Sequence, residues 1–319
     1  MTESTGQTAI AHTNIALIKY WGKADSALNL PTTSSLSLTL NEYFTKTRVE
    51  EAAEDTLLIN DLPQDSQRVH DFLNVLREEK GDFSPVKVIS ENKVPLSAGL
   101  ASSASSFAAL TAAVAKYNGW DLSLEELSRL ARRGSGSATR SFFSGFAIWE
   151  KGSNDHDSFA HEFNVPDLPI ALVVCKISGT VKKVSSSDGM RRAQTSPDYD
   201  QWVAESAKQL DEMKQALSQG DLDRVGQLAE ANALAMHDLN LTATDRRFTY
   251  FNQNTMKVLE QVKVLREKGY LAYATMDAGP NVKIITNQEQ APAIKDFLVE
   301  RFRKIQFDIA TPGPGISYE

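Results

Sequence analysis

The chain has 319 residues, of which 41% are hydrophobic and 24% are charged, and its net charge at pH 7 is −7. This length favours two domains, and the acidic balance argues against general nucleic-acid binding. No apolar stretch is long enough to cross a bilayer, and the polar opening residues do not have the pattern of a signal peptide. Cys175 is the single cysteine and cannot form an internal disulfide, so we expect a cytoplasmic location.

The first half of the chain mixes predicted strands with predicted helices. Apolar residues alternate with period two in the strands, whereas they recur every three or four residues in the helices. A capping box formed by Ser123 and Glu126 predicts the start of one helix. The predicted strands are 36–40, part of 45–49 and 86–89, and the predicted helices are 65–79, 107–116 and 124–132.

Two prolines within 164–169 mark a joint, which predicts domains over 1–166 and 167–319. The second half has longer helices, with Leu234 and Met256 among the apolar positions of two of them. The Pro-Gly-Pro-Gly tail over 312–315 is expected to be loose. The predicted helices are 202–217, 222–234, 256–262 and 293–301, and the predicted strands are 271–276, 282–285 and 305–309. Strands segregated from long helices indicate an α+β fold.

The most informative segment is the run of small and hydroxyl residues over 95–106, which leads into a predicted helix. Small side chains allow backbone N–H groups to approach an anion, and the helix directs the positive end of its dipole at that anion. Serine hydroxyls can donate to phosphate oxygens or contact magnesium. The segment therefore suggests a phosphate site, although a buried Ser/Ala-rich helix start without a ligand gives the same pattern.

Two further segments carry cations beside small residues. In 14–23, Lys19 and Lys23 bracket a Tyr-Trp-Gly turn, so that Lys23 and the Tyr20 hydroxyl could grip an anion. In 134–141, a glycine-serine stretch precedes Arg140, whose guanidinium suits a carboxylate or phosphate. The alternatives are an edge strand that ends in a turn and a flexible loop with a surface arginine.

Two later segments are weaker signals. The hydroxyl-rich turn over 184–192 precedes a helix and could serve only as its N-cap. Asp277 ends a predicted strand at a Gly-Pro turn, where a turn-forming aspartate is the simpler explanation.

Taken together, these segments resemble the diphosphomevalonate decarboxylase family. The resemblance rests on 11–23, 31–38, 98–103, 134–140 and 276–281, and it extends from Ala11 to beyond Asn281. The family belongs to the superfamily of galactokinase, homoserine kinase, mevalonate kinase and phosphomevalonate kinase. The resemblance implies an N-terminal domain like ribosomal protein S5, a ferredoxin-like α+β C-terminal domain, and an active site in the cleft between them.

The resemblance also implies a reaction. ATP phosphorylates the 3-hydroxyl of mevalonate 5-diphosphate, phosphate and carbon dioxide then leave, and isopentenyl diphosphate remains. ATP and Mg²⁺ are the implied cofactors, and a homodimer with no membrane or nucleic-acid partner is expected. Two alternatives stay open, namely a kinase of the same superfamily that stops after phosphoryl transfer and a binding protein that has lost catalysis.

The family's motifs map onto particular residues of this chain. The implied catalytic residues are Asp277, Arg140 and Lys23. The implied substrate-binding residues are Asn14, Tyr20, Trp21, Gly22, Lys23, Arg68, Ser135, Gly136, Ser137, Ala138, Thr139, Arg140, Ser186 and Ser187. The implied ATP-binding residues are Ser97, Ala98, Gly99, Leu100, Ala101, Ser102 and Ser103, and Ser103 is also the expected magnesium contact.

One position departs from the family pattern. Several bacterial relatives have arginine where this chain has Ser187, which removes a cation over the diphosphate. Lys182, Lys183 or Arg191 could replace that cation, or the diphosphate could bind less tightly.

Overall fold

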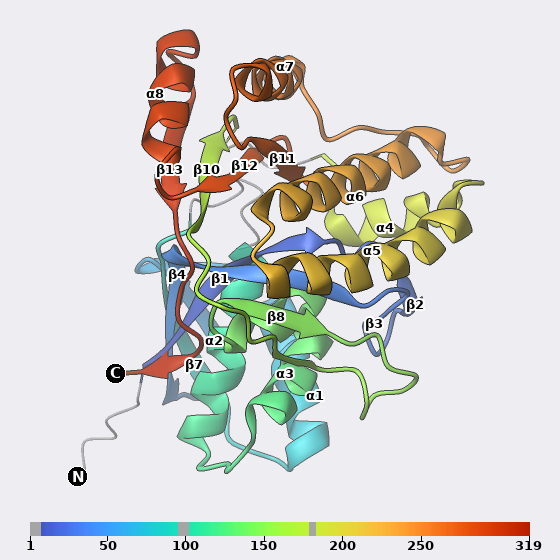
Figure 1. Cartoon of the computed structure of the whole chain (residues 1–319). Helices are drawn as coiled ribbons and strands as arrows, with labels where there is room; N and C mark the ends of the chain where they lie inside the picture. The colour runs from blue at the N-terminus through green and yellow to red at the C-terminus, as the bar shows by residue number, and fades with distance from the viewer. Residues whose placement is uncertain (1–7, 95–101, 179–182) are drawn as a thin grey trace.

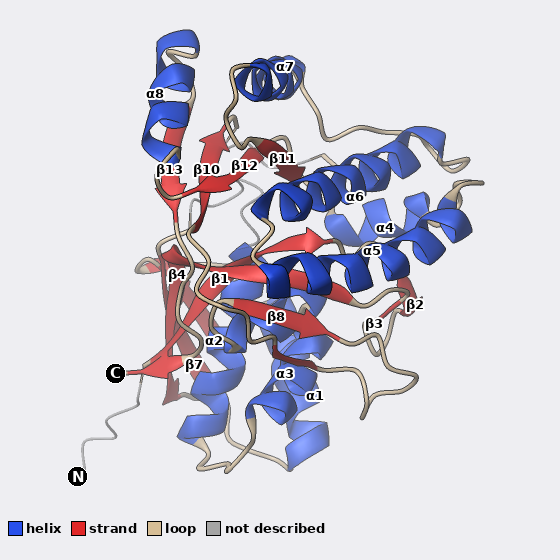
Figure 2. Ribbon diagram, viewed as in Figure 1, coloured by secondary structure: helices blue, strands red, loops and turns tan. Residues whose placement is uncertain are grey.

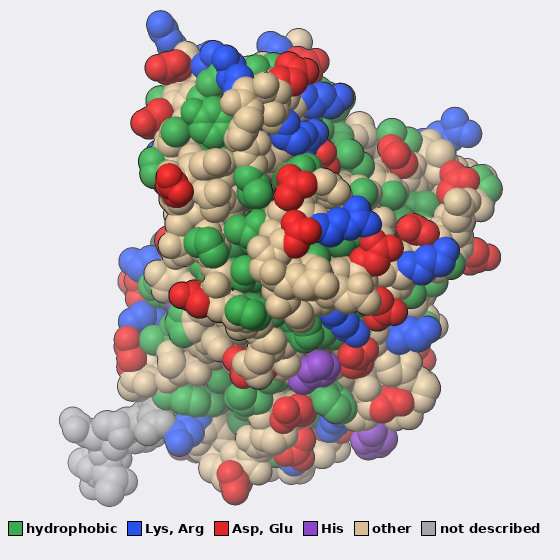
Figure 3. All heavy atoms as spheres, viewed as in Figure 1, with side chains coloured by type: hydrophobic (Ala, Val, Ile, Leu, Met, Phe, Trp, Pro, Cys, Tyr) green, Lys and Arg blue, Asp and Glu red, His purple; other side chains and the backbone are tan. Residues whose placement is uncertain are grey.

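The computed structural model describes residues 8–94, 102–178 and 183–319 (Figure 1). Residues 97–101 of the predicted phosphate loop, and Lys182, lie outside the described residues. Within the described residues, no helix has the length and apolarity that a membrane span requires. On the face drawn in Figure 3, acidic and basic side chains are interspersed.

The N-terminal half builds a mixed sheet whose centre is one long strand, β4. The strand order is β14-β1-β4-β7-β5-β6, and β8 pairs with both β4 and β9. The predicted strands 36–40 and 45–49 are both parts of β4, which continues through the polar residues between them. The bounds are β1 Ala9–Ile18, β4 Ser35–Glu51, β5 Thr56–Ile59, β6 Leu62–Pro63, β7 Val86–Asn92, β8 Phe146–Trp149, β9 Ala160–Glu162 and β14 Ser317–Tyr318, with β2 Lys23–Asp25 and β3 Leu30–Pro31 forming a separate pair.

Helices α1 (Gln67–Lys80), α2 (Ser102–Tyr117) and α3 (Leu124–Gly134) gather below this sheet in Figure 2. Every residue of α2 from 107 to 115 is buried, because its many alanines let the helix lie close to β1 and β4. The predicted capping box at the start of α3 is confirmed. A 3₁₀ helix, η1 (Gly136–Phe142), follows α3 directly.

The C-terminal half builds a second sheet of four antiparallel strands in the order β11-β12-β10-β13. This is the order of a ferredoxin-like fold, with the four described helices α4 to α7 in the first crossover instead of one (Figures 1 and 2). The predicted α+β class is therefore confirmed. The bounds are β10 Ile170–Lys176, α4 Ser186–Ala193, α5 Tyr199–Gln219, α6 Leu222–Thr242, α7 Gln253–Glu267, β11 Tyr273–Met276, β12 Val282–Asn287, α8 Ala291–Arg301 and β13 Gln306–Ala310.

Two residues assigned to buried helix faces are exposed. Leu234 of α6 and Met256 of α7 are 37% and 51% exposed. The buried stripe of α6 runs instead through Ala229, Ala233 and Met236, at spacings of four and three residues. Leu234 follows Ala233 directly and points away from that stripe, because successive helical side chains are rotated by about 100°.

The prediction of a loose tail over 312–315 is wrong. The Gly313 N–H donates to the Thr39 carbonyl at 2.8 Å, and the Gly313 carbonyl accepts from the Gly145 N–H at 3.0 Å. Ile316 donates to the Phe142 carbonyl, and β14 then pairs with β1. The glycine permits a close backbone approach to β4 that a side chain would block. The end of the chain therefore returns to the N-terminal sheet.

We expect Gly313→Ala to destabilise the protein by about 1–3 kcal/mol, the usual cost of overpacking. A Cβ atom at this position would lie 2.5 Å from the backbone of Leu40 and Asn41, which cannot move aside as a flexible side chain could. Urea denaturation measures the change in the free energy of unfolding. The exposed neighbour Pro314→Ala is the control, and equal stability of the two variants would contradict the prediction.

Candidate active site

A cavity of about 680 Å³ is lined by residues from both halves of the chain. The N-terminal half contributes β1 and the turn after it, the N-terminus of α2, and the junction of α3 with η1. The C-terminal half contributes α4, α6 and the residues after β11. The described lining residues are Asn14, Ala16, Lys19, Tyr20, Trp21, Lys23, Asn29, Arg68, Ser102, Ser103, Gly134, Ser135, Gly136, Ser137, Arg140, Ser185, Ser186, Ser187, Met190, Met236, Asp277 and Ala278.

Asp277 binds two lysines on opposite oxygens. Its Oδ1 accepts from Nζ of Lys19 at 2.7 Å, and its Oδ2 accepts from Nζ of Lys283 at 2.8 Å. Lys19 also donates to the Ala16 carbonyl at 2.7 Å. The lysine side chains are 2% and 0% exposed, whereas that of Asp277 is 20% exposed. The carboxylate therefore faces the cavity, while its counterions are enclosed by protein.

Burial and charge act in opposite directions on these groups. Burial alone raises the pKa of Asp277, but Lys19 and Lys283 more than offset it and hold the net pKa well below the ordinary carboxyl value. Burial lowers the pKa of Lys19 to about 8, despite the opposing effect of Asp277. Asp277 is therefore ionised near neutral pH, and a carboxylate with so low a pKa suits accepting and orienting a hydroxyl better than keeping its proton.

Arg140 forms a second polar cluster in the cavity. Its Nε donates to Oδ1 of Asn14 at 3.3 Å, and one terminal nitrogen donates to the hydroxyl of Ser35. Asn14 in turn donates to the Ser137 carbonyl and the Ser141 hydroxyl. Arg140 is 2% exposed, and burial lowers its pKa to about 10, which leaves it charged. A fixed, buried guanidinium of this kind suits a carboxylate ligand.

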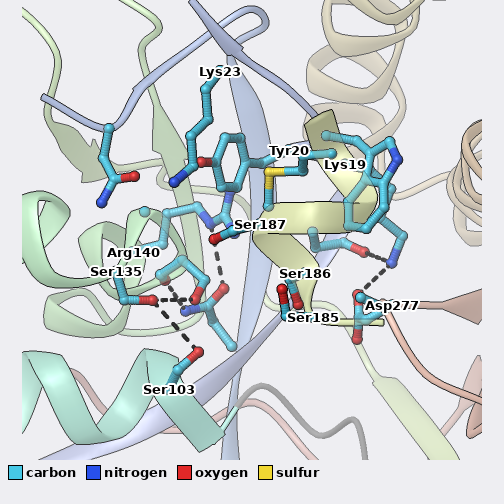
Figure 4. A pocket seen from close by; sticks show the side chains of 18 of the residues that line it. Lys19, Tyr20, Lys23, Ser103, Ser135, Arg140, Ser185, Ser186, Ser187 and Asp277 are labelled. Carbon is cyan, nitrogen blue, oxygen red and sulfur yellow. Dashed lines mark hydrogen bonds and ion pairs between the residues drawn. The ribbon is translucent and has the colours of Figure 1, made fainter. Parts of the chain in front are cut away.

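Serine hydroxyls occupy the side of the cavity nearest α2. The hydroxyl of Ser135 lies 3.4 Å from that of Ser103 and 3.2 Å from that of Ser137. Ser102 and Ser103 form the first turn of α2, whose N-terminal end carries partial positive charge. In Figure 4 this group and the Lys19–Asp277 pair lie on opposite sides of the view, with Ser186 and Ser187 between them.

The other cations of the described cavity lining are Lys23 and Arg68. Burial and the neighbouring Arg68 lower the pKa of Lys23. Arg68 donates to the Gly134 carbonyl at 3.1 Å and stacks on the Phe107 ring. The buried hydroxyl of Tyr20 has no hydrogen-bond partner among the described residues, so its hydrogen-bonding capacity is unused.

The structure places three predicted substrate-binding residues behind the cavity lining. Gly22 has a φ of +133°, and a Cβ atom there would lie 1.7 Å from the Tyr199 hydroxyl, so its glycine is required by packing. Ala138 and Thr139 are fully buried within η1, where Thr139 donates to the Gly136 carbonyl. These three residues support the wall, and the other predicted substrate-binding residues line it.

Arg191 does not replace the cation that is lost where this chain has Ser187 instead of arginine. Its guanidinium pairs with Asp188 at 2.9 Å and Asp245 at 2.6 Å, and its side chain is 59% exposed. Ser187 itself lines the cavity, whereas neither Arg191 nor Lys183 does. Ser185 caps α4 by accepting from the Asp188 N–H, which is the capping role weighed for this segment, and it also faces the cavity.

Sequence reasoning assigned no role to Lys19, Lys283 or Asn29. The amide nitrogen of Asn29 donates to the carbonyls of Arg132 and Arg133 and so fixes the α3–η1 junction. Lys283 carried a readable signal, since a lysine between Val282 and Ile284 is unusual in an apolar strand. Met190 and Met236 give the cavity an apolar wall that no motif revealed.

Comparison with known proteins identifies the family. Residues 11–160 match the diphosphomevalonate decarboxylase-like N-terminal domain, and residues 172–311 match the mevalonate 5-diphosphate decarboxylase C-terminal domain. The chain belongs to the diphosphomevalonate decarboxylase family. The diphosphomevalonate decarboxylase of Debaryomyces hansenii is 35% identical over an alignment that covers 93% of this chain and 84% of the relative.

Solved structures of decarboxylases agree with this assignment. The mevalonate diphosphate decarboxylase of Enterococcus faecalis is 43% identical, with 98% of each chain covered and a TM-score of 0.90. A complex of MDDEF with MVAPP, AMPPCP and magnesium is 44% identical, with the same coverage and a TM-score of 0.93. The relatives therefore share the whole two-domain architecture of this decarboxylase-family chain.

We expect kcat/KM to fall as the pH rises through about 8, because Lys19 then loses the proton that pairs it with Asp277. Protonated Lys19 prevails below this pH, so the fall is confined to the alkaline side. The pH profile of the wild type is compared with that of Lys19→Met, which should have a low rate and lack this fall.

Lys23 is the control for this profile, because its pKa is also lowered and it lines the same cavity. Lys23→Gln should keep the alkaline fall. An unchanged alkaline fall in Lys19→Met would show that another group titrates there.

Proposed function

We propose that this protein catalyses the ATP-dependent decarboxylation of mevalonate 5-diphosphate to isopentenyl diphosphate, within the mevalonate pathway of isoprenoid synthesis. The observation that carries the proposal is that Arg140 and Asp277, from the two halves of the chain, line one cavity together with Lys23. One substrate has to present a hydroxyl, a carboxylate and a diphosphate, and these three residues match those groups in charge and chemistry.

The reaction divides into a phosphoryl transfer from ATP and an elimination of phosphate and carbon dioxide. The 3-hydroxyl oxygen attacks the γ-phosphorus of ATP, ADP leaves, and the proton of the hydroxyl is released to solvent. The bond between C3 and the phosphorylated oxygen then breaks, and phosphate departs with the electron pair of that bond. The electrons of the C–C bond to the carboxylate form the double bond, and carbon dioxide is released. Asp277 accepts a hydrogen bond from the hydroxyl and orients it, and Arg140 holds the carboxylate in line for the elimination.

The diphosphate of the substrate is assigned to Lys23, Tyr20 and the serines. The unused hydroxyl of Tyr20 supports this assignment, since a buried donor without a partner gains a hydrogen bond from a phosphate oxygen. Ser135, Ser137, Ser186 and Ser187 add further donors on the same cavity. Asn14 and Arg68 are assigned to hold Arg140 and the α3–η1 junction in place.

ATP is assigned to the segment 97–103, of which Ser102 and Ser103 are described. The fit rests on the hydroxyls of the first turn of α2 and on their contact with Ser135, which give anion donors at a helix N-terminus. Within the described residues, no cluster of three or more His, Cys, Asp or Glu could hold a metal ion. Magnesium would therefore rest on phosphate oxygens with Ser103 as its protein contact, and it would neutralise phosphate charge.

A cytoplasmic homodimer is also part of the proposal. A buried, unpaired Cys175 suits a reducing compartment. The dimer rests on the family resemblance, and sedimentation equilibrium of the purified protein measures it directly.

The test of the function is a product assay with mevalonate 5-diphosphate, ATP and magnesium. Carbon dioxide and ADP should form in equal amounts, and Asp277→Ala should reduce both by roughly 100- to 10,000-fold. Asp308→Ala is the matched control, because Asp308 also pairs with a lysine of the C-terminal sheet but lies outside the cavity.

The assay separates the alternatives. A phosphorylated product that accumulates without carbon dioxide would indicate a kinase that stops after transfer. Substrate binding without any ADP release would indicate a binding protein. Mevalonate and its 5-phosphate, offered in parallel, show whether the diphosphate is required.

A further inference from the structure

Lys283 is a charged residue where the fold needs an apolar one. It lies on β12, which has a partner strand on each side and pairs Lys283 with Thr275 and Val174. The period of two places it on the same face as Ile285, which packs in the core with Val225 of α6 and Ile15 of β1. Burying an ammonium group there is strongly unfavourable unless it is paired. Its charge therefore requires an explanation beyond packing.

The contact with Asp277 supplies that explanation. Lys283 is 0% exposed and does not line the cavity, yet its Nζ lies 2.8 Å from Oδ2 of Asp277. The chain leaves β11 at Met276, turns through 278–281 and returns along β12, which brings the two side chains together. Lys283 thus reaches the carboxylate from the side away from the substrate space.

Neutralising Asp277 does not require Lys283. Lys19 already binds Oδ1 at 2.7 Å and brings one positive charge to one negative charge. With Lys283 present, two ammonium groups and one carboxylate leave one net positive charge. The second lysine changes the geometry as well, because a carboxylate held on one oxygen can rotate about its Cβ–Cγ bond, whereas one held on both oxygens cannot.

We propose that Lys283 is a positioning residue, which holds Oδ2 of Asp277 while Lys19 holds Oδ1 and so fixes the carboxylate toward the hydroxyl of the substrate. The proposal rests on the proposed function, and it assigns no substrate contact to Lys283. The orientation of the Asp277 carboxylate is then fixed before the substrate arrives. Such preorganisation raises the rate of the chemical step rather than the affinity.

The charged groups around Asp277 determine how its pKa changes when Lys283 is replaced. Among the described residues, the charged and titratable groups that act on it are Lys19 after β1, Lys283 on β12, Arg140 on η1 and His237 on α6. Burial lowers the pKa of His237 to about 3, so this residue is neutral near pH 7. Loss of Lys283 removes one of the three positive charges that the described part of the chain places near the carboxylate, which raises the pKa of Asp277.

The test is steady-state kinetics of Lys283→Met in the full-length enzyme, with its fold checked by thermal denaturation. We expect kcat to fall by up to about a hundredfold, the size of effect known for misplaced reacting groups, with KM for both substrates unchanged. The acidic limb of the kcat/KM profile should move to higher pH, because Asp277 then titrates at higher pH. Lys283→Gln, which keeps a donor without the charge, should fall between Lys283→Met and the wild type.

Lys176→Met is the matched control. Lys176 lies on β10 of the same sheet and pairs with Asp308, but it is outside the cavity. Its kcat and pH profile should match those of the wild type. The wild type must release carbon dioxide under these conditions, so that a failure of the proposed function is recognised separately.

Several results would overturn the proposal. A folded Lys283→Met variant with the kcat and acidic limb of the wild type would do so, as would a rise in KM with kcat unchanged. An equal loss in Lys176→Met would show a general effect on the sheet. If Lys283→Met and Lys283→Gln both fail to fold, Lys283 has a structural role instead, since Lys19 still pairs Asp277 in both.

Discussion

The contact between Lys19 and Asp277 joins the two domains at the place where the chemistry is assigned. Lys19 follows the first strand of the N-terminal sheet, and Asp277 follows a strand of the C-terminal sheet. Their 2.7 Å contact is buried on the lysine side and open on the carboxylate side. The Lys19 N–H also donates to Asn232 of α6 at 2.8 Å, so backbone and side chain both cross the domain boundary. The remaining groups of the cavity take their positions around this contact.

The distribution of charge in the cavity is opposite to that of the whole chain. The net charge of the chain is −7, yet the described lining contains Lys19, Lys23, Arg68 and Arg140 against Asp277 alone. Local concentration of cations allows an acidic protein to attract a polyanionic ligand without general affinity for nucleic acid. The apolar wall of Met190 and Met236 strengthens this attraction, because it lowers the dielectric response around the charges.

The sequence predicted features with local causes. The capping box of α3 and the strand that leads to Asp277 depend on residues close together in the chain. Motifs also pointed to Arg140, Lys23 and the serine segments. The contact of Lys19 with Asp277 and the course of the tail after Gly313 depend on partners far away in the sequence, and periodicity carries no information about such partners. Leu234 illustrates a smaller error, because apolar residues can lie beside a buried stripe as well as within it.

The return of the chain's end to the first sheet has a mechanical consequence. The polypeptide passes from one domain to the other after β9 and comes back after β13, and β14 anchors the return on β1. A domain tethered by one linker can swivel in any direction, whereas a second crossing of the chain restricts its rotation. A buried cluster that contains Ile15 and Leu38 of the N-terminal half with Leu210 and Ile285 of the C-terminal half restrains rotation further. Both constraints hold the two walls of the cavity at a fixed separation.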